Sequence, residues 1–240
     1  MTDSVRTPRQ RARAQTIDDI TRLGREHLAA HGAAALSLRA IARDLGLVSS
    51  AVYRYVKSRD DLLTLLVVDA YSELGDEVNR AVESVPEENY AGRFRALARA
   101  ARGWAVREPA RYALIFGSPV PGYRAPAEQT TEPGTRVIRA LVRIYDDAYR
   151  AGAISRPLPA ASNGVAADTP LAADLERIRN EMHLETDDDL VVRGTLVWAS
   201  LFGAISFEVF GQYGQNTFGD PEQLFEQYLT LLQGMVGLGG

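Results

Sequence analysis

The chain has no cysteine and only three histidines in 240 residues. Without cysteine it forms no disulfide, no thiolate zinc site and no cysteine nucleophile, which fits a reducing cytoplasm. We expect His27 to pack inside a helix and His31 to lie at its end, where a cation suits the helix dipole. No Ser-His-Asp order and no catalytic pair of carboxylates stands out. The sequence therefore predicts a protein that is not an enzyme and that needs no metal and no cofactor.

Long apolar runs and strand patterns are also absent. No apolar run reaches 18 residues, and residues 1–14 are polar and rich in arginine, so we expect neither a membrane span nor a signal peptide. Apolar residues recur at helical spacing, and no stretch alternates as a strand does. With 46% hydrophobic residues the chain can fill a real core. The predicted fold class is all-α.

Net charge is small, but it is unevenly distributed. The total is only −4, yet residues 1–59 hold 11 Lys and Arg against 5 Asp and Glu, whereas residues 60–240 hold 16 against 26. A basic head on an acidic body is typical of a DNA-binding protein with a second module attached. We therefore divide the chain into a DNA-binding domain at 1–59 and a second helical domain at 60–240.

Residues 36–63, LSLRAIARDLGLVSSAVYRYVKSRDDLL, carry the most specific signal. Ser37 can cap a short helix that runs to about residue 45, and Gly46 can supply the left-handed turn that ends it. Ser49 or Ser50 can cap the next short helix, whose inward positions are apolar. Its outward positions carry polar, aromatic and basic residues, which folding alone does not require but which a recognition helix in a major groove uses: Ser50, Tyr53, Arg54, Tyr55 and Lys57.

This segment resembles the DNA-binding domain of the TetR family of bacterial repressors. The residues that match the family pattern are Ser37, Leu38, Arg39, Ile41, Ala42, Gly46, Ala51, Tyr53, Ser58, Leu62 and Leu63. Val48 stands where the family often has Ser, Val56 where it has Phe, and Arg59 where it has Lys. The resemblance implies a homodimeric regulator, most often a repressor, in the bacterial cytoplasm at the nucleoid. Its implied partners are a near-palindromic DNA operator and a small-molecule effector.

Two kinds of DNA contact follow from this interpretation. We expect four residues to touch base edges, because Arg suits guanine, Ser suits either base and Ala suits the thymine methyl group: Ser49, Ser50, Ala51 and Arg54. We expect six others to bind phosphates, which position the protein without specifying sequence: Ser37, Arg39, Tyr53, Tyr55, Lys57 and Arg59. In TetR relatives the positions of Tyr53 and Arg59 bind phosphate.

The residues that precede the head allow two interpretations. A segment with Arg6, Arg9, Arg11 and Arg13 among polar neighbours can be a solvated, disordered tail, or a basic arm that touches the DNA backbone or minor groove. In either case we expect the first helix to begin only at about residue 16 and to end at Gly32.

Beyond the head the pattern predicts seven more helices, at residues 58–84, 91–107, 109–116, 132–150, 171–184, 190–213 and 221–236, with a long loop at 151–170. The first of them leaves the head as one long helix, which we expect to connect the two domains rigidly. The last two carry more apolar surface than one chain can cover. We therefore expect them to form the dimer interface.

A weaker resemblance concerns the effector. Residues 108–123 (EPARYALIFGSPVPGY) and 196–213 (LVWASLFGAISFEVFGQY) look like a TetR subgroup with a Y-x-L-x-F-G segment and a late W-x-x-x-H-G, with Phe202 in the place of the His. Aromatic residues in and near these stretches are either ordinary core or the lining of an apolar ligand pocket, with Glu108, Arg111 or Glu208 as polar handles. We name five candidate effector contacts: Trp104, Tyr112, Phe116, Trp198 and Phe202.

An alternative class of function stays open at this stage. The chain can instead be a helical ligand-binding or protein-interaction module with a vestigial DNA-binding head. The outward polar and basic residues of the recognition helix favour DNA. Binding to DNA and binding to an acidic protein both weaken as salt rises, so salt dependence does not distinguish the two functions. A preference for one DNA sequence does, because only the regulator has it.

Overall fold

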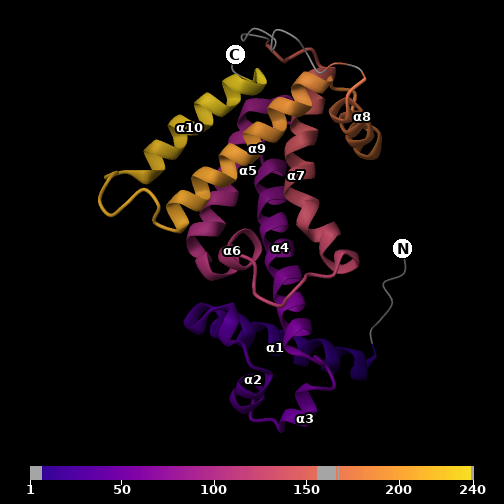
Figure 1. Cartoon of the computed structure of the whole chain (residues 1–240), viewed down its shortest axis with the longest axis vertical. Helices are drawn as coiled ribbons and strands as arrows, with labels where there is room; N and C mark the ends of the chain where they lie inside the picture. Colours follow the sequence, from indigo (N-terminus) through magenta and orange to yellow (C-terminus); the bar gives the residue numbers. More distant parts are fainter. Residues whose placement is uncertain (1–6, 156–165, 167, 239–240) are drawn as a thin grey trace. The chain divides into compact units, whose positions relative to one another are not determined.

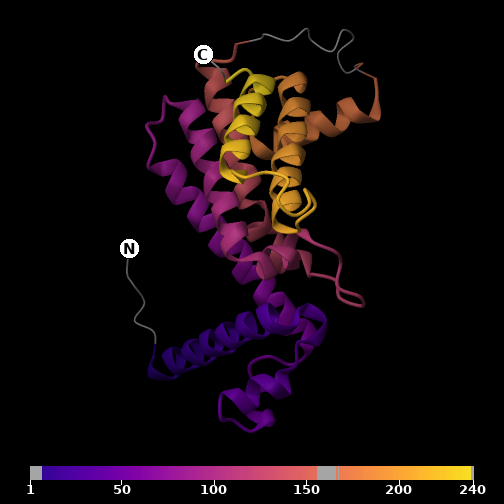
Figure 2. The same cartoon turned by 90° about the vertical axis from the view of Figure 1, so that its left-hand side faces the viewer.

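The computed structural model describes residues 7–155, 166 and 168–238, and this part of the chain is helical, without a strand (Figure 1, Figure 2). Its elements in chain order are α1 (Pro8–His31), a single 3-10 turn (Ala33–Ala35), α2 (Leu38–Asp44), α3 (Ser49–Val52), α4 (Arg59–Glu83), α5 (Tyr90–Arg107), α6 (Pro109–Phe116), α7 (Ala127–Arg150), α8 (Pro170–Met182), α9 (Asp188–Val209) and α10 (Pro221–Val236). The all-α prediction is confirmed.

The chain divides into two compact units, which we describe separately. The first unit comprises the residues up to Glu73 together with Glu108–Gly134, and the second comprises Leu74–Arg107 and the residues from Thr135 onward. Helices α4 and α7 supply residues to both units. The functional boundary that we predict at residue 59 falls inside the first unit and stays a prediction.

The core of the first unit is the core of the predicted head. One face of α1, the inner faces of α2 and α3 and the first turns of α4 meet there: Ile20, Leu23, Leu28, Leu36, Leu38, Ile41, Ala42, Val52, Val56, Leu62, Leu63 and Leu66. Ser37 caps α2 as predicted, because its Oγ accepts a hydrogen bond from the Ala40 N–H at 3.5 Å. Side chains of α6 and of the following loop also pack on this core: Ala110, Leu114, Val120 and Tyr123.

Helix α1 begins at Pro8 and not at about residue 16, so the predicted start is wrong. Thr7 and Gln10 form a capping box: Thr7 Oγ1 accepts from the Gln10 N–H at 3.3 Å, and Gln10 Oε1 accepts from the Thr7 N–H at 2.7 Å. Pro8 occupies the first helical position, where its missing N–H is not needed. The predicted arm is therefore helical over residues 8–14, whereas residues 1–6, including Arg6, lie outside the described residues.

Two further predictions about helix starts are wrong. The N-cap of α3 is Val48, and no side chain caps this helix; the Ala51 N–H bonds instead to the Val48 carbonyl at 2.9 Å. Helix α7 starts at Ala127 and contains Pro133, although proline disfavours a helix interior. Pro133 is buried, so tertiary packing outweighs the local preference that placed the predicted start beside it.

A buried ion-pair cluster joins three helices of the first unit. Arg111 of α6 is 3% exposed, and its guanidinium donates to Asp69 Oδ2 at 2.9 Å and to Glu73 Oε1 at 2.8 Å, both on α4. Arg25 of α1 donates from Nε to the same Asp69 oxygen at 2.7 Å and lies 3.2 Å from Glu73. The hydrogen bond to Asp69, helped by the neighbouring negative charges, raises the pKa of Arg25. Arg111 is thus held by protein carboxylates.

In the second unit, α5, α9 and α10 pack on one another, and Figure 2 shows α10 (yellow) running beside α9 (orange). The buried face of α5 is apolar: Phe94, Leu97, Ala98, Ala101, Trp104 and Ala105. Glu226 of α10 accepts from Arg95 at 2.8 Å and from Arg99 at 2.6 Å, both on α5. The bond from Arg99, together with the charges of both arginines, lowers the pKa of Glu226.

Helix α9 is apolar along most of its length. Asp187 caps it by accepting from the Leu190 N–H at 2.9 Å, and Asp188 and Asp189 in its first turn suit the positive end of the helix dipole. By length and composition this helix is able to cross a membrane: its most apolar window has a mean hydropathy of 1.6, and 33% of that window is buried within the chain. A core helix of a soluble protein passes the same test, but here an apolar side of the helix is exposed.

We expect Arg111→Met to lower the free energy of unfolding by about 3 kcal/mol, because the change removes the buried cation that pairs with both Asp69 and Glu73. The control is Arg107→Met, since the Arg107 side chain is 57% exposed, against 3% for Arg111, and its pair with Glu77 should be worth less than about 1 kcal/mol. Thermal and denaturant unfolding followed by circular dichroism measure both. Equal losses in the two variants would contradict a special role for Arg111.

Candidate nucleic-acid interface and effector site

Helices α2 and α3 form a helix-turn-helix in the first unit. Gly46 has a φ of 67°, a left-handed conformation that allows the chain to turn directly after α2. The Leu47 N–H then bonds to the Ala42 carbonyl at 2.9 Å, which closes the turn. Val52 and Val56 are buried on the inner side, so they fix which residues of this segment face outward.

Half of the residues that the sequence predicts for DNA contact face outward, and Tyr55, which we predicted to face outward, packs on the head core instead. Five of the ten candidates are exposed: Arg39, Ser50, Tyr53, Arg54 and Lys57. The other five are partly buried: Ser37, Ser49, Ala51, Tyr55 and Arg59. Helix α3 is only about one turn long and ends at Val52. Residues Tyr53 to Tyr55 continue as a turn, in which the Tyr55 N–H bonds to the Val52 carbonyl at 2.9 Å. The predicted recognition helix is thus shorter than expected.

Arg59 is engaged inside the protein. Its guanidinium donates to the backbone carbonyl of Ala33 at 2.9 Å and to that of Ala34 at 3.3 Å, in the 3-10 turn after α1. The side chain therefore ties the start of α4 to the end of α1. A phosphate contact from Arg59 stays a prediction, and such a contact would have to share the guanidinium with these carbonyls.

Val48 and Leu47 were missed as candidate contacts. Val48, the N-cap of α3, is 72% exposed, and Leu47 is 41% exposed. The start of a recognition helix is the part that approaches base edges, and an exposed apolar side chain there can meet a thymine methyl group. The signal in the sequence is an apolar residue, Val48, at a position where the family often has Ser.

Of the five candidate effector contacts, Tyr112 and Phe116 belong to the first unit, and Trp104, Trp198 and Phe202 belong to the second. In the first unit, the rings of Tyr112 and Phe116 lie 5.1 Å apart. In the second, the rings of Trp198 and Phe202 lie 4.2 Å apart, and Trp104 is fully buried. Their role in effector binding stays a prediction.

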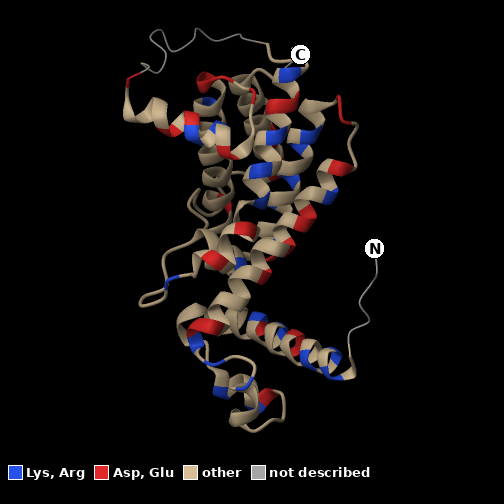
Figure 3. Cartoon of the chain, turned by 90° about the vertical axis from the view of Figure 1, so that its right-hand side faces the viewer, with Lys and Arg blue, Asp and Glu red and all other residues tan. Residues whose placement is uncertain are grey.

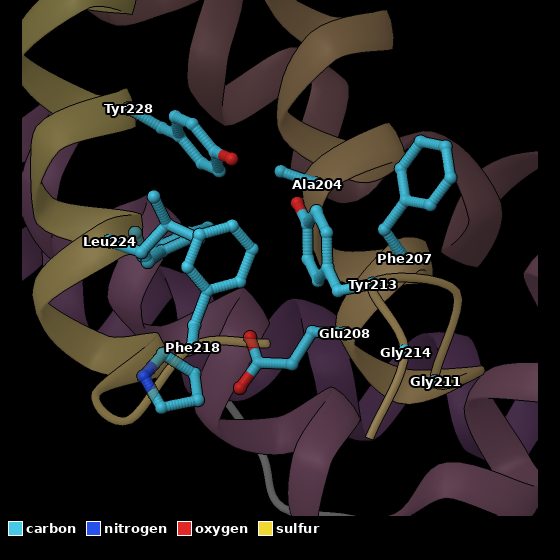
Figure 4. Close-up of a pocket in the computed structure, with 11 residues that line it drawn as sticks. Ala204, Phe207, Glu208, Gly211, Tyr213, Gly214, Phe218, Leu224 and Tyr228 are labelled. Carbon is cyan, nitrogen blue, oxygen red and sulfur yellow. The ribbon is translucent and has the colours of Figure 1, made fainter. Parts of the chain in front are cut away.

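A small cavity lies in the second unit where α9 leads into the loop before α10 (Figure 4). Its volume is about 120 Å³, below the roughly 300 Å³ of a typical ligand pocket. Its wall is mostly aromatic and aliphatic and includes one carboxylate, that of Glu208, which accepts from Arg102 at 2.7 Å. The pKa of Tyr213 is raised to about 12, mainly because the side chain is partly buried and to a smaller extent because it forms a hydrogen bond with Tyr228. None of the five predicted effector contacts lines this cavity.

Comparison with known proteins identifies the family. Residues 20–66 match the bacterial regulatory proteins of the tetR family, and residues 94–232 match the tetracyclin repressor-like C-terminal domain. The second match covers more than half of the chain. The chain therefore belongs to the TetR family of helix-turn-helix transcriptional regulators, and the resemblance inferred from residues 36–63 is confirmed.

Individual relatives support the same conclusion. The chain is 50% identical over 224 residues to the HTH-type transcriptional regulators Rv1816 of Mycobacterium tuberculosis and Mb1846 of Mycobacterium bovis, over 93% of this chain and 93% of each relative. The solved structure of the regulatory protein SCO4313 is similar, with a TM-score of 0.75 and 35% identity over 95% of this chain and 100% of that chain. A tetR-family regulatory protein from Rhodococcus RHA1 shares the fold, with a TM-score of 0.59, 16% identity and coverage of 93% and 98%.

These findings set the class of function. The protein is a DNA-binding transcriptional regulator of the bacterial cytoplasm, and its family is not enzymatic. The narrower resemblance to the W-x-x-x-H-G subgroup stays a prediction.

We expect Arg54→Ala to weaken operator binding by about 1–3 kcal/mol and to relax the preference at one base pair, because a guanine contact is lost. Lys57→Ala should weaken binding to operator and scrambled DNA alike, and should lower the slope of log affinity against log salt by about one. Titrations at several salt concentrations measure both effects.

The control for these two variants is Arg80→Ala, an exposed arginine in the second unit that should change neither quantity. If Arg54→Ala keeps the wild-type preference at every base pair, Arg54 does not touch a base edge.

Proposed function

We propose that this regulator is a homodimeric repressor that leaves a near-palindromic operator when a small, largely apolar effector binds. The observation that carries the DNA half of the proposal is the exposed set on the helix-turn-helix: Arg39, Ser50, Tyr53, Arg54 and Lys57. Folding gives no reason for these side chains to gather on one segment, whereas phosphate and base contact does. We also propose that the protein associates with the nucleoid.

Base contact in this proposal lies on α3 and on the turn that follows it. Ser49, Ser50, Ala51 and Arg54 are the predicted base-edge residues, and exposed Val48 joins them as an apolar contact to a thymine methyl group. Ser37, Arg39, Tyr53, Tyr55, Lys57 and Arg59 are the proposed phosphate contacts. A mobility shift on the DNA upstream of the protein's own gene tests the proposal. Binding that depends on salt but not on DNA sequence would favour a protein-interaction module instead.

The dimer is proposed from the exposed side of α9 and α10. Val192, Leu196 and Phe207 on α9 are 39%, 52% and 46% exposed, and Leu231 on α10 is 66% exposed. The α9 residues recur at helical spacing and so share one face. An open groove of about 460 Å³ between the two helices is lined almost entirely by apolar atoms, and it includes Phe207 and Leu231. A second copy of the same two helices is the occupant that we propose for it.

Small residues allow that copy to approach closely. A Cβ built on Gly203, which lines the groove, meets no atom within 4 Å, so this part of α9 faces open space. Another apolar stripe of α9, with Val197, Leu201 and Ile205, is buried in the chain's own core. The proposed interface therefore uses the neighbouring stripe that contains Val192, Leu196 and Phe207. Two heads joined in this way fit half-sites about 34–36 Å apart, or a multiple of that distance.

The double variant Leu196→Glu, Leu231→Glu should be a folded monomer, because both side chains are exposed in the single chain and charge is costly only at an interface. Its operator affinity should fall about 100-fold or more, since the two half-sites are no longer bound by one molecule. Light scattering gives the molar mass, and circular dichroism checks the fold.

The matched control is Leu171→Glu, which changes a 51% exposed leucine on α8 and should leave a dimer. A double variant that keeps the dimer mass would show that the interface lies elsewhere.

We propose an apolar effector because the charged groups that could bind a polar one already form ion pairs within the protein. Arg111 lies among Asp69, Glu73 and Glu108, the last at 3.5 Å, and Glu208 is held by two bonds from Arg102. These handles are neutralised by protein partners, so a charged ligand would have to displace an ion pair. Trp104, Tyr112, Phe116, Trp198 and Phe202 are aromatic, so an apolar ligand would contact them without displacing an ion pair.

Release from DNA requires a connection between effector and head. Helix α4 runs without interruption from Arg59 to Glu83, close to the single helix predicted at 58–84, and it supplies residues to both units. An effector changes DNA affinity only by binding two states of the protein with different affinities. A coupling of about 1–3 kcal/mol would weaken operator binding about 5–150-fold.

Tryptophan fluorescence tests the effector site, because Trp104 and Trp198 are the only tryptophans of the chain and both belong to the predicted set. In a screen of small apolar compounds, a true effector should change the fluorescence and weaken operator binding by about 5–150-fold. Phe202→Leu should reduce both responses.

Phe218→Leu, at the small cavity before α10, is the matched control and should keep both responses. The opposite pattern would place the effector in that cavity. A compound that strengthens operator binding would contradict release by the effector.

A further inference from the structure

The first turns of α1 place arginines where a helix disfavours them. Arg9, Arg11 and Arg13 lie in these turns, the first turn holds no acidic residue, and the next acidic residue is Asp18. The N-terminal end of a helix carries partial positive charge, so three cations there oppose the helix dipole. The helix nevertheless starts at this point because the Thr7 capping box and Pro8 specify it. A sequence that builds a helix start against its own charge suggests a use for the charge.

Two of the three arginines share the face of α1 that packs on the head. With about 100° of rotation per residue, Arg9 and Arg13 lie within about 20° of Ile20, which is fully buried in the head core. Arg11 lies about 180° from Ile20, on the opposite face. Arg9 and Arg13 are both exposed, so they extend the inner stripe of α1 beyond the part that the head covers.

Arg13 lies beside the recognition segment. Its guanidinium carbon is 5.4 Å from the centroid of the Tyr55 ring, a cation–π contact. Tyr55 packs on the head core and directly follows Arg54, the predicted base contact. Arg13 therefore places a positive charge beside the segment that we predict to contact DNA. Figure 3 shows the basic residues (blue) gathered toward the N-terminal end of α1.

We propose that Arg9 and Arg13 bind DNA phosphates beside each half-site, so that the start of α1 is a second DNA-contacting element next to α3. The proposal rests on operator binding by the helix-turn-helix. Arginines spaced by one helical turn, next to a segment that enters the groove, fit the backbone of the same duplex. These contacts add affinity and salt dependence, and they do not read sequence.

The test compares the full-length double variant Arg9→Gln, Arg13→Gln with the matched control Arg11→Gln. Glutamine keeps helix propensity, and circular dichroism confirms that α1 persists. Operator and scrambled DNA are titrated between 50 and 300 mM salt. Each lost phosphate contact lowers the slope of log affinity against log salt by about 0.9, so four lost contacts in a dimer lower it by about 3–4. The base preference should stay that of the wild type.

Each outcome separates this proposal from operator binding itself. If the wild type binds operator and the double variant keeps its salt slope, the α1 contact is wrong while the helix-turn-helix function stands. An equal loss in Arg11→Gln would also overturn the proposal, because it would show that the face of α1 does not matter. If the wild type binds no DNA, the proposed function itself fails.

Discussion

The first unit depends on the ion pairs that the buried guanidinium of Arg111 makes with Asp69 and Glu73. The guanidinium joins α6 to two carboxylates of α4, and Asp69 in turn holds Arg25 of α1. A charge that is 3% exposed is tolerated only while its partners stay in place, because an uncompensated buried charge is strongly destabilising. The positions of α1, α4 and α6 are therefore linked. Since α1 and α4 also supply the core under α2 and α3, any shift of α6 or α4 within this unit bears on the DNA-contacting segment.

Local signals explain most of the helices that could be predicted from the sequence. Pro109 and Pro221 stand at first helical positions and Gly117 and Gly237 follow last ones, so α6 and α10 have the predicted bounds. The start of α1 carries equally clear signals in Thr7 and Pro8, but the arginines around them favoured either a disordered tail or a DNA-contacting arm over a helix. Pro133 shows the reverse case, because packing that no local pattern reveals keeps a proline inside α7.

The candidate site was predictable where it depends on helical periodicity and not where it depends on contacts distant in sequence. Periodicity correctly placed Arg39, Ser50, Arg54 and Lys57 outside and Val52 and Val56 inside. It could not show that Arg59 is held by the carbonyls of Ala33 and Ala34, because that pairing spans 25 residues or more. It also could not say which apolar stripe of α9 stays exposed, since that is decided by how α5 and α10 pack on it.

Lys57 offers the most direct measurement of the central claim, that the exposed residues after α3 contact DNA. It is the only lysine of the chain and its side chain is exposed, so an amine-reactive reagent reports on one side chain besides the chain's α-amino group. Mass spectrometry of the Lys57 peptide gives the rate of modification. Saturating operator DNA should slow this rate severalfold, and added salt that dissociates the complex should restore it. An unchanged rate with operator bound would contradict the account.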